Sequence, residues 1–249
     1  MMAKSRFYEL RKEAMPNQME IIKVARRLLE EKHKLSAEDI KQNFDDLILE
    51  IEKLGYKEYL KVQEKVNVKL LAGLMSKKFR NLEEKGEKAI EMLIEENFDL
   101  LDDFFKSLGQ SRKSRAGRTF EENLKWLLKK LDYPFEERVV IDGRPDFLFP
   151  SVQEYHKNPM NCIIFTAKRT LRERWRQIVT EGTRGLGFFL ATLDDKISVD
   201  EIVEMKNHRI HMVIPSSVKD SVPIYKNAPN VISFKTFFKH HLDPAMKRW

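Results

Sequence analysis

Apolar residues in the first half of the chain recur with the spacing of amphipathic helices. Over residues 17–75 they come in pairs that lie three or four residues apart, for example Ile21–Ile22, Val24–Ala25 and Leu28–Leu29. Residues at this spacing share one face of a helix. Ser36, followed three residues later by Asp39, resembles a capping box. The pattern predicts three helices here, the second over 36–55 and the third over 57–75.

An acidic helix and a basic segment follow. The helical pattern continues over 83–108, and Gly109 suits the end of a helix. Residues 110–118, QSRKSRAGR, combine four bases with two serines and a glycine. They predict a polar loop suited to phosphates or base edges, with a solvated basic loop as the alternative. Thr119, with a glutamate three residues on, predicts the start of a helix over 119–130.

The second half contains short apolar runs separated by turn signals. Two runs flank Asp142-Gly143 and predict hairpin strands over 136–141 and 144–149, with Pro145 at an edge or bend. The later segments predict, in chain order, a strand over 162–167, a helix over 175–183, a strand over 186–192, a helix over 198–205, a strand over 211–215 and a terminal helix over 233–241. These elements predict an α/β or α+β core with a mixed, roughly five-stranded sheet flanked by helices.

The composition describes an ordered soluble protein, with 42% hydrophobic and 34% charged residues in a chain of 249. No apolar run approaches the roughly 18 residues of a membrane span, and the N-terminus lacks the apolar centre of a signal peptide. We therefore expect a cytoplasmic protein without a membrane partner. The lone Cys162 is expected to be a buried thiol, and the six histidines show no zinc spacing. The net charge of +7 moderately favours anionic partners.

Three charged residues surround the predicted central strand. Asp146 lies where the second hairpin strand bends, Lys168 ends the next strand, and Glu181 lies on the following helix. Divalent ions such as Mg²⁺ prefer a few well-placed oxygen ligands, and they assist phosphodiester cleavage by stabilising charge and activating water. Asp146 and Glu181 can supply ligands, and Lys168 can orient the water or neutralise the phosphate. Together they predict a metal-dependent nuclease site.

The order Pro145-Asp146, strand, Lys168 resembles the PD-(D/E)xK nuclease signature, in which a hairpin aspartate and a lysine of the neighbouring strand face one metal site. That signature places an acidic residue two positions before the lysine, where this chain has Thr166. In one subgroup the missing carboxylate lies on the next helix, and Glu181 occupies that place. The resemblance implies a restriction-endonuclease-like core with Asp146 and Glu181 as metal ligands.

Two further segments resemble the type II restriction endonucleases of the EcoRII, SsoII and PspGI group, with most agreement to PspGI. Residues 168–174, KRTLRER, look like the group's K-x-x-x-R-(D/E)-R segment, and SRAG at 114–117, followed by Phe120-Glu121, looks like its upstream loop and helix. The likeness implies a homodimeric, Mg²⁺-dependent site-specific deoxyribonuclease in which Glu121 supports the metal site.

The middle of the first segment suits direct readout of G·C pairs. Arginine donates bidentately to guanine O6 and N7, and a carboxylate accepts from cytosine N4. Arg172, Glu173 and Arg174 therefore suit adjacent G·C pairs, each worth roughly 1–3 kcal/mol of discrimination. The resemblance implies a palindromic CC-GG core, CCWGG or CCNGG, cut before the first cytosine. Further contacts to phosphates or base edges are expected from Arg112, Lys113, Arg115, Arg118 and Arg176.

Members of the group flip the central bases of their site into pockets, which needs a stacking side chain in each subunit. Phe79, with Met75 one helical turn earlier, is the candidate here. The expected organisation is a helical region over 1–109, which serves support, dimerisation and part of the DNA-binding surface, and a nuclease core over 110–249.

Two alternatives remain open. One is a PD-(D/E)xK nuclease for repair or branched DNA, which would cut by shape. The other is a non-enzymatic DNA-binding protein that keeps the arginines. No nucleotide cofactor is expected, because the chain has no Walker pattern and the glycines of 182–187 follow a predicted helix.

Overall fold

The structure, a computed structural model, describes residues 6–79, 88–141, 143–171 and 187–249. The chain divides into two compact units, each built from two separate stretches of sequence. The helical unit comprises Met1–Arg27 and Lys53–Ala116, and the sheet unit comprises Leu28–Glu52 and Gly117–Trp249. None of the described helices is long and apolar enough to cross a membrane.

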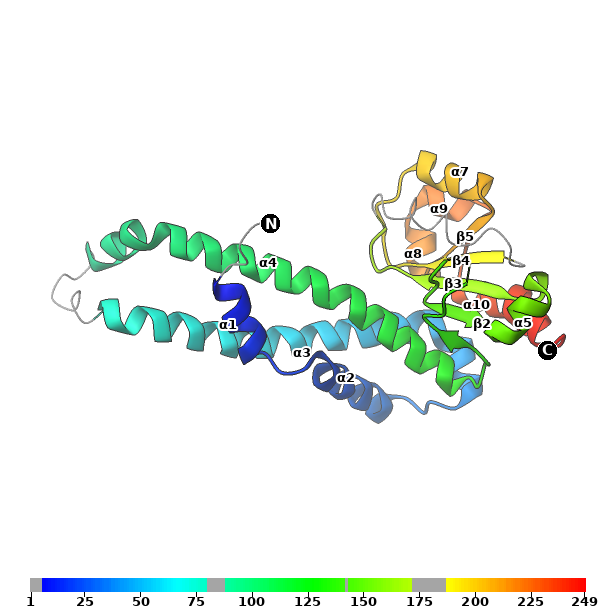
Figure 1. Cartoon of the computed structure of the whole chain (residues 1–249), viewed down its shortest axis with the longest axis horizontal. Helices are drawn as coiled ribbons and strands as arrows, with labels where there is room; N and C mark the ends of the chain where they lie inside the picture. Colours follow the sequence, from blue (N-terminus) through cyan, green and yellow to red (C-terminus); the bar gives the residue numbers. More distant parts are fainter. Residues whose placement is uncertain (1–5, 80–87, 142, 172–186) are drawn as a thin grey trace. The chain divides into compact units, whose positions relative to one another are not determined.

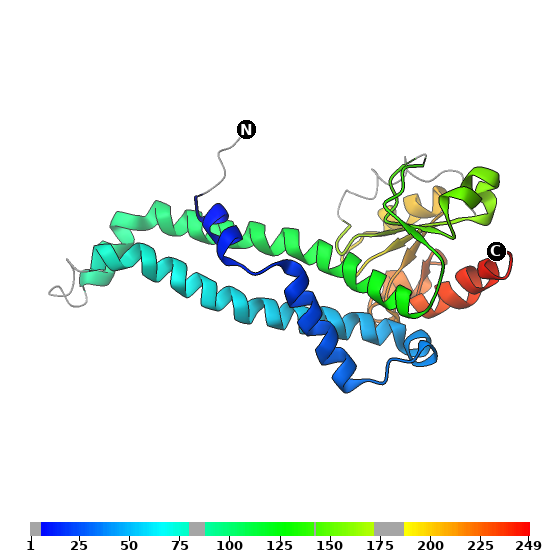
Figure 2. The same ribbon diagram turned by 60° about the horizontal axis from the view of Figure 1, so that its bottom comes forward.

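Helices make up the described part of the first half of the chain. They are α1 (Arg6–Ala14), α2 (Gln18–Lys32), α3 (Ala37–Phe79) and α4 (Lys88–Lys130). The predicted start at Ser36 is confirmed, because the Ser36 hydroxyl accepts a hydrogen bond from the amide of Asp39 at 3.2 Å. Within the helical unit α3 and α4 run side by side, and α1 packs against α4 (Figure 2).

Two predicted helix ends are wrong. Gly55 lies buried inside α3 and Gly109 lies inside α4, so each helix runs for 43 residues. A glycine inside a helix costs only about 1 kcal/mol relative to alanine, which packing of its neighbours offsets. The helices instead deviate at asparagines, Asn43 in α3 (φ −112°) and Asn97 in α4 (φ −129°).

Residues 110–118 belong to α4, so the loop predicted from their polar composition is wrong. Arg112 Nε donates to Gln63 Oε1 of α3 at 3.0 Å. The guanidinium of Arg115 lies over the ring of Tyr59, 5.7 Å from its centroid. Because these long side chains pack against α3, tertiary contacts favour the helix here over a solvated loop.

The described part of the sheet unit contains a mixed six-stranded sheet in the order β1-β2-β3-β4-β5-β6. Strands β1 to β3 pair antiparallel and β3 to β6 pair parallel. Their bounds are β1 (Glu136–Glu137), β2 (Phe147–Phe149), β3 (Ile163–Ala167), β4 (Gly187–Ala191), β5 (Ile210–Val213) and β6 (Val231–Ile232). The predicted α/β class is confirmed. Strand β6 was not predicted, and the hairpin strands are shorter than predicted.

Helical segments cover both faces of the sheet. They are α5 (Val152–Lys157), η2 (Pro159–Asn161), α7 (Val199–Asn207), α8 (Ser216–Ser221), α9 (Pro223–Asn227), α10 (Phe234–Phe237), η4 (Phe238–Leu242) and α11 (Asp243–Met246). Successive residues of a strand point to opposite faces. Ile164 of β3 therefore joins a core cluster with residues of α7 and α9, whereas Phe165 contacts Phe237 of α10 at a centroid distance of 5.0 Å. Figure 1 shows α7 and α9 next to each other, above the strands.

Candidate active site

Asp146 and Lys168 meet through the antiparallel pairing of β2 with β3. Asp146 immediately precedes β2 and Lys168 immediately follows β3. The register Phe147↔Phe165 brings the start of β2 beside the end of β3. As a result, Lys168 Nζ lies 3.0 Å from Asp146 Oδ2. The fold thus brings together two of the three residues that the sequence singles out for catalysis.

Three donors converge on one oxygen of Asp146. Oδ2 accepts hydrogen bonds from Thr166 Oγ1 (2.9 Å), the Ala167 amide (2.8 Å) and Lys168 Nζ (3.0 Å). The Asp146 side chain is 12% exposed, and that of Lys168 is 34% exposed. Among the described residues none donates a hydrogen bond to the other oxygen, Oδ1. The bonds therefore fix the orientation of the carboxylate and leave Oδ1 for a ligand.

Thr166 stands where the common signature has an acidic residue. The residue is buried, and its hydroxyl donates to Asp146. A carboxylate in this place would face the Asp146 carboxylate at short distance, where two like charges repel each other. Thr166 instead donates a hydrogen bond to Asp146 Oδ2.

Among the described residues, the Asp146 carboxylate is chemically suited to bind a hard divalent cation. Its Oδ1 is an anionic oxygen of the kind that Mg²⁺ prefers. Glu181, expected as the second ligand, lies outside the described residues. The described residues contain no group of three or more acidic, histidine or cysteine side chains placed to hold a metal. Among the described residues of the site, Asp146 is the one that could supply a metal ligand.

Glu121 of α4 is linked to this pair through Arg138. Arg138 Nη2 and Nε both donate to Glu121 Oε1, at 2.7 and 3.1 Å. The Arg138 amide donates to the carbonyl oxygen of Asp146 at 3.2 Å. The hydrogen bond to Glu121 and the charges of Glu121 and Asp146 raise the pKa of the guanidinium. Arg138 carries no motif signal in the sequence, and it has a left-handed φ of 50°, which is uncommon outside glycine.

Several predicted site residues lie outside the described part of the chain. The segment 172–186 contains Arg172, Glu173, Arg174, Arg176 and Glu181, and the side chains of Met75 and Phe79 near the end of α3 are likewise not described. Their predicted roles in base reading, metal binding and base flipping stay predictions.

The predicted DNA contacts in 110–118 lie on α4. Arg112, Lys113 and Arg118 are exposed. Arg115 is half-buried, and burial lowers the pKa of its guanidinium. Exposure suits Lys113 and Arg118 for phosphate contacts, whereas Arg112 donates to Gln63 and Arg115 packs on Tyr59 within the helical unit. Their roles towards DNA stay predictions.

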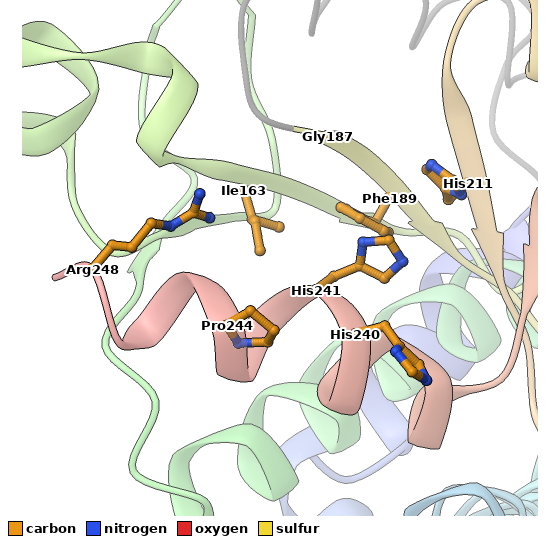
Figure 3. A pocket seen from close by; sticks show the side chains of 8 residues that line it. All are labelled: Ile163, Gly187, Phe189, His211, His240, His241, Pro244 and Arg248. Atoms are coloured by element: carbon orange, nitrogen blue, oxygen red, sulfur yellow. The ribbon is translucent and has the colours of Figure 1, made fainter.

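A pocket of about 370 Å³ lies at the opposite ends of the strands (Figure 3). Ile163 and Gly187, which line it, begin β3 and β4, whereas Lys168 follows the end of β3. His241 packs against Phe189 with ring centroids 4.8 Å apart, and burial lowers the pKa of His241 to about 4. At neutral pH this imidazole carries no charge that would attract a phosphate. The pocket is therefore separate from the candidate active site.

Comparisons with known proteins show which proteins this chain resembles. A family model described as EcoRII C terminal matches residues 79–238. The chain is 32% identical over 140 residues to the type II restriction enzyme EcoRII of Escherichia coli, and 31% identical over 150 residues to the type II restriction enzyme SsoII of Shigella sonnei. These matches cover 53% and 55% of this chain but 35% and 48% of the relatives. The chain thus matches less than half of the length of either relative.

Solved structures show the same fold. Metal-depleted Ecl18kI in complex with uncleaved, modified DNA has a TM-score of 0.83 and 25% identity, covering 99% of this chain and 85% of that one. A complex of the restriction endonuclease PspGI with substrate DNA has a TM-score of 0.67 and 19% identity, covering 95% and 94%. The expected particular likeness to PspGI is therefore wrong, because the likeness to Ecl18kI is greater in both measures. Since the family model covers well over half of the chain and includes Glu121, Asp146 and Lys168, the chain belongs to the EcoRII C-terminal family.

Proposed function

We propose that the protein is a homodimeric, Mg²⁺-dependent type II restriction endonuclease. It hydrolyses double-stranded DNA at a short palindrome with a CC-GG core, CCWGG or CCNGG, and cuts before the first cytosine. The observation that carries the proposal is the convergence of Thr166, Ala167 and Lys168 on one oxygen of Asp146, in a chain of this family. The related type II restriction enzymes support the reaction class.

Each residue of the site has a distinct part in hydrolysis. Asp146 offers Oδ1 to the metal, and Glu181 provides the second carboxylate. When bound, Mg²⁺ supplies positive charge that stabilises the phosphate in the transition state and lowers the pKa of a nearby water. Lys168 orients the attacking water or neutralises the developing charge on the phosphate. Glu121, held by Arg138, supports the metal site from α4.

The segment that follows Lys168 recognises the bases of the DNA site. Arg172 and Arg174 read guanines through bidentate hydrogen bonds, and Glu173 accepts from cytosine N4. Arg112, Lys113, Arg115, Arg118 and Arg176 contact phosphates or base edges, which fixes the register of the protein on the duplex. The central bases flip out and stack on Phe79 and Met75.

A palindromic site calls for a two-fold protein. An apolar stripe on α4 supports the dimer: Ile90, Ile94, Phe98 and Phe105 are 64%, 45%, 66% and 62% exposed. Before the deviation at Asn97, Ile90 and Ile94 share one face of α4 at a spacing of four residues, and after it Phe98 and Phe105 share one face at a spacing of seven. Several large apolar side chains exposed on one helix are typical of an interface between proteins. We assign the stripe to contact with a second copy of the chain.

Digestion of plasmid DNA in the presence of Mg²⁺, with mapping of the ends, tests the proposal. Discrete fragments that begin at the first cytosine of CC-GG sites, and that disappear when EDTA is added, are expected. Cutting confined to branched or junction DNA would indicate the structure-specific nuclease instead. Binding without any cutting would indicate the non-enzymatic DNA-binding protein.

A further inference from the structure

The short stretch between Lys168 and Leu171 is anchored to the end of β4. The carbonyl oxygen of Arg169 accepts a hydrogen bond from Thr192 Oγ1 at 3.2 Å. The Leu171 amide donates to Asp194 Oδ2 at 2.9 Å, and the Leu171 side chain is fully buried in the core. Arg169 and Leu171 are therefore both bound to residues that directly follow β4, just before the start of the proposed base-reading segment.

A third tie comes from α3. Glu52 is 8% exposed, and its Oε2 lies 3.4 Å from Arg169 Nε. Its Oε1 accepts a hydrogen bond from Asn123 Nδ2 at 2.9 Å. Burial raises the pKa of Glu52, while the hydrogen bond from Asn123 and the charge of Arg169 act in the opposite direction. A buried carboxylate is costly without a partner, so this pair holds the Arg169 side chain towards α3.

The anchored stretch lies between the residue proposed to cut and those proposed to read. Lys168 precedes Arg169, and Arg172 follows Leu171. The anchored stretch therefore ends at the residue before Arg172, the first residue of the proposed base-reading segment. A shift of the stretch by about 1 Å would misplace the phosphate relative to Lys168, and such misplacement can cost about 100-fold in rate.

We propose that Glu52, through Arg169, and Asp194, through the Leu171 amide, are positioning residues that fix the stretch 169–171, from which the proposed base-reading segment starts, relative to Lys168. They act on specificity because a correctly read base pair then places the phosphate correctly for cleavage. The inference rests on the proposed function. Neither acid contacts DNA in this role.

The test compares cleavage of two duplexes by Glu52→Gln. Glutamine keeps an acceptor for Asn123 and removes the charge that faces Arg169. In single-turnover reactions the rate on the CC-GG duplex should fall about 10- to 100-fold. The ratio of this rate to the rate on a duplex with one G·C pair replaced should fall by a similar factor. Arg169→Met should reproduce the loss, and Arg169→Lys, which keeps the ion pair, should retain most of the ratio.

Asp45→Asn is the matched control for a purely structural effect. Asp45 is a buried carboxylate on the same helix, and it accepts hydrogen bonds from the amides of Phe234 and Lys235 at 3.0 and 3.4 Å. Its replacement should lower Tm and leave the ratio of the two rates unchanged. If Glu52→Gln lowers Tm as Asp45→Asn does and also leaves the ratio unchanged, the positioning role is overturned.

Amide hydrogen exchange gives a readout that does not depend on activity. Without DNA, the Leu171 amide should exchange faster in Glu52→Gln and in Asp194→Asn than in wild type, and Asp45→Asn should leave it unchanged. Equal protection of Leu171 in all four proteins would refute the proposal. If the wild-type protein cuts no DNA at all, the proposed function fails, and the exchange rates still decide whether Glu52 and Asp194 anchor this stretch. If Glu52→Gln does not fold, the same cleavage and exchange measurements are made on Asp194→Asn.

Discussion

The two carboxylate oxygens of Asp146 have different surroundings, and this difference bears on the role of Lys168. Oδ2 takes all three hydrogen bonds from Thr166, Ala167 and Lys168. Two of these donors, a hydroxyl and a backbone amide, do not depend on Lys168. The carboxylate therefore keeps its orientation when the lysine is removed, which separates the contribution of Lys168 to chemistry from its contribution to structure.

Lys168→Ala should reduce the DNA cleavage rate by about 10²- to 10³-fold, since one preorganised positive donor at the phosphate is lost. Affinity for the CC-GG duplex should change little, because Thr166 and Ala167 still hold Asp146. Single-turnover cleavage and fluorescence anisotropy measure the two quantities. Lys196→Ala, at an exposed lysine, is the control and should cleave as wild type. Substantial remaining turnover in Lys168→Ala would show that the lysine has no catalytic role.

Residues that act through distant partners could not be predicted from the sequence. Asp146 and Lys168 flank two adjacent strands and carry a motif, so the order of residues is enough to suggest the pair. Arg138 and Glu52 have no motif, and their roles come from contacts with Glu121 and Arg169, which lie 17 and 117 residues away along the chain. Such pairings depend on how helices pack on the sheet, which periodicity alone does not specify.

At the level of elements, the predicted bounds of the central strand agree with the structure better than the predicted helix ends do. The apolar run that became β3 is fully buried, and its predicted bounds are nearly those observed. Gly55 was predicted to end a helix, yet it lies between Ile51 and Tyr59, which are buried one turn before and one turn after it. Burying a large apolar side chain contributes roughly 1.5–3 kcal/mol, which outweighs the cost of about 1 kcal/mol for a helical glycine. The apolar stripe that continues through Gly55 was the signal to follow.

The exposed apolar residues of helix α4 lead to a testable prediction. Phe98→Ser combined with Phe105→Ser should convert the proposed dimer to a monomer, because both rings are more than 60% exposed in the single chain and a second copy would bury them. Sedimentation velocity measures the mass. Val203→Ser on α7, where the valine is 49% exposed, is the control and should stay dimeric. A double variant that remains dimeric would place the interface elsewhere.

At the scale of the whole molecule, buried ionisable groups make stability depend on pH with opposite signs. Burial raises the pKa of Asp45 and of Glu52, so in both cases the folded chain holds a proton more readily than the unfolded chain. Their contribution to stability grows as pH falls. Burial lowers the pKa of His211 and of His241, and these histidines act in the reverse direction. The slope of the unfolding free energy against pH is the sum of the contributions of all ionisable groups. The contribution of a single group is therefore best tested by the difference between a variant and wild type.

His241→Phe should make stability less sensitive to acid. The unfolded chain protonates His241 near its ordinary pKa of 6.5, whereas the folded chain protonates it only near pH 4, because burial and the neighbouring His211 and His240 oppose the charge. Wild type therefore loses stability as pH falls from about 6.5 to about 4. The loss at this half-buried site is on the order of 1 kcal/mol after allowance for solvent screening. Urea unfolding at pH 7.5, 6 and 5 measures it: the pH 7.5 difference reports packing against Phe189, and any further change at lower pH reports the proton. Parallel stability curves for the two proteins would show that His241 does not contribute to the acid sensitivity of the fold.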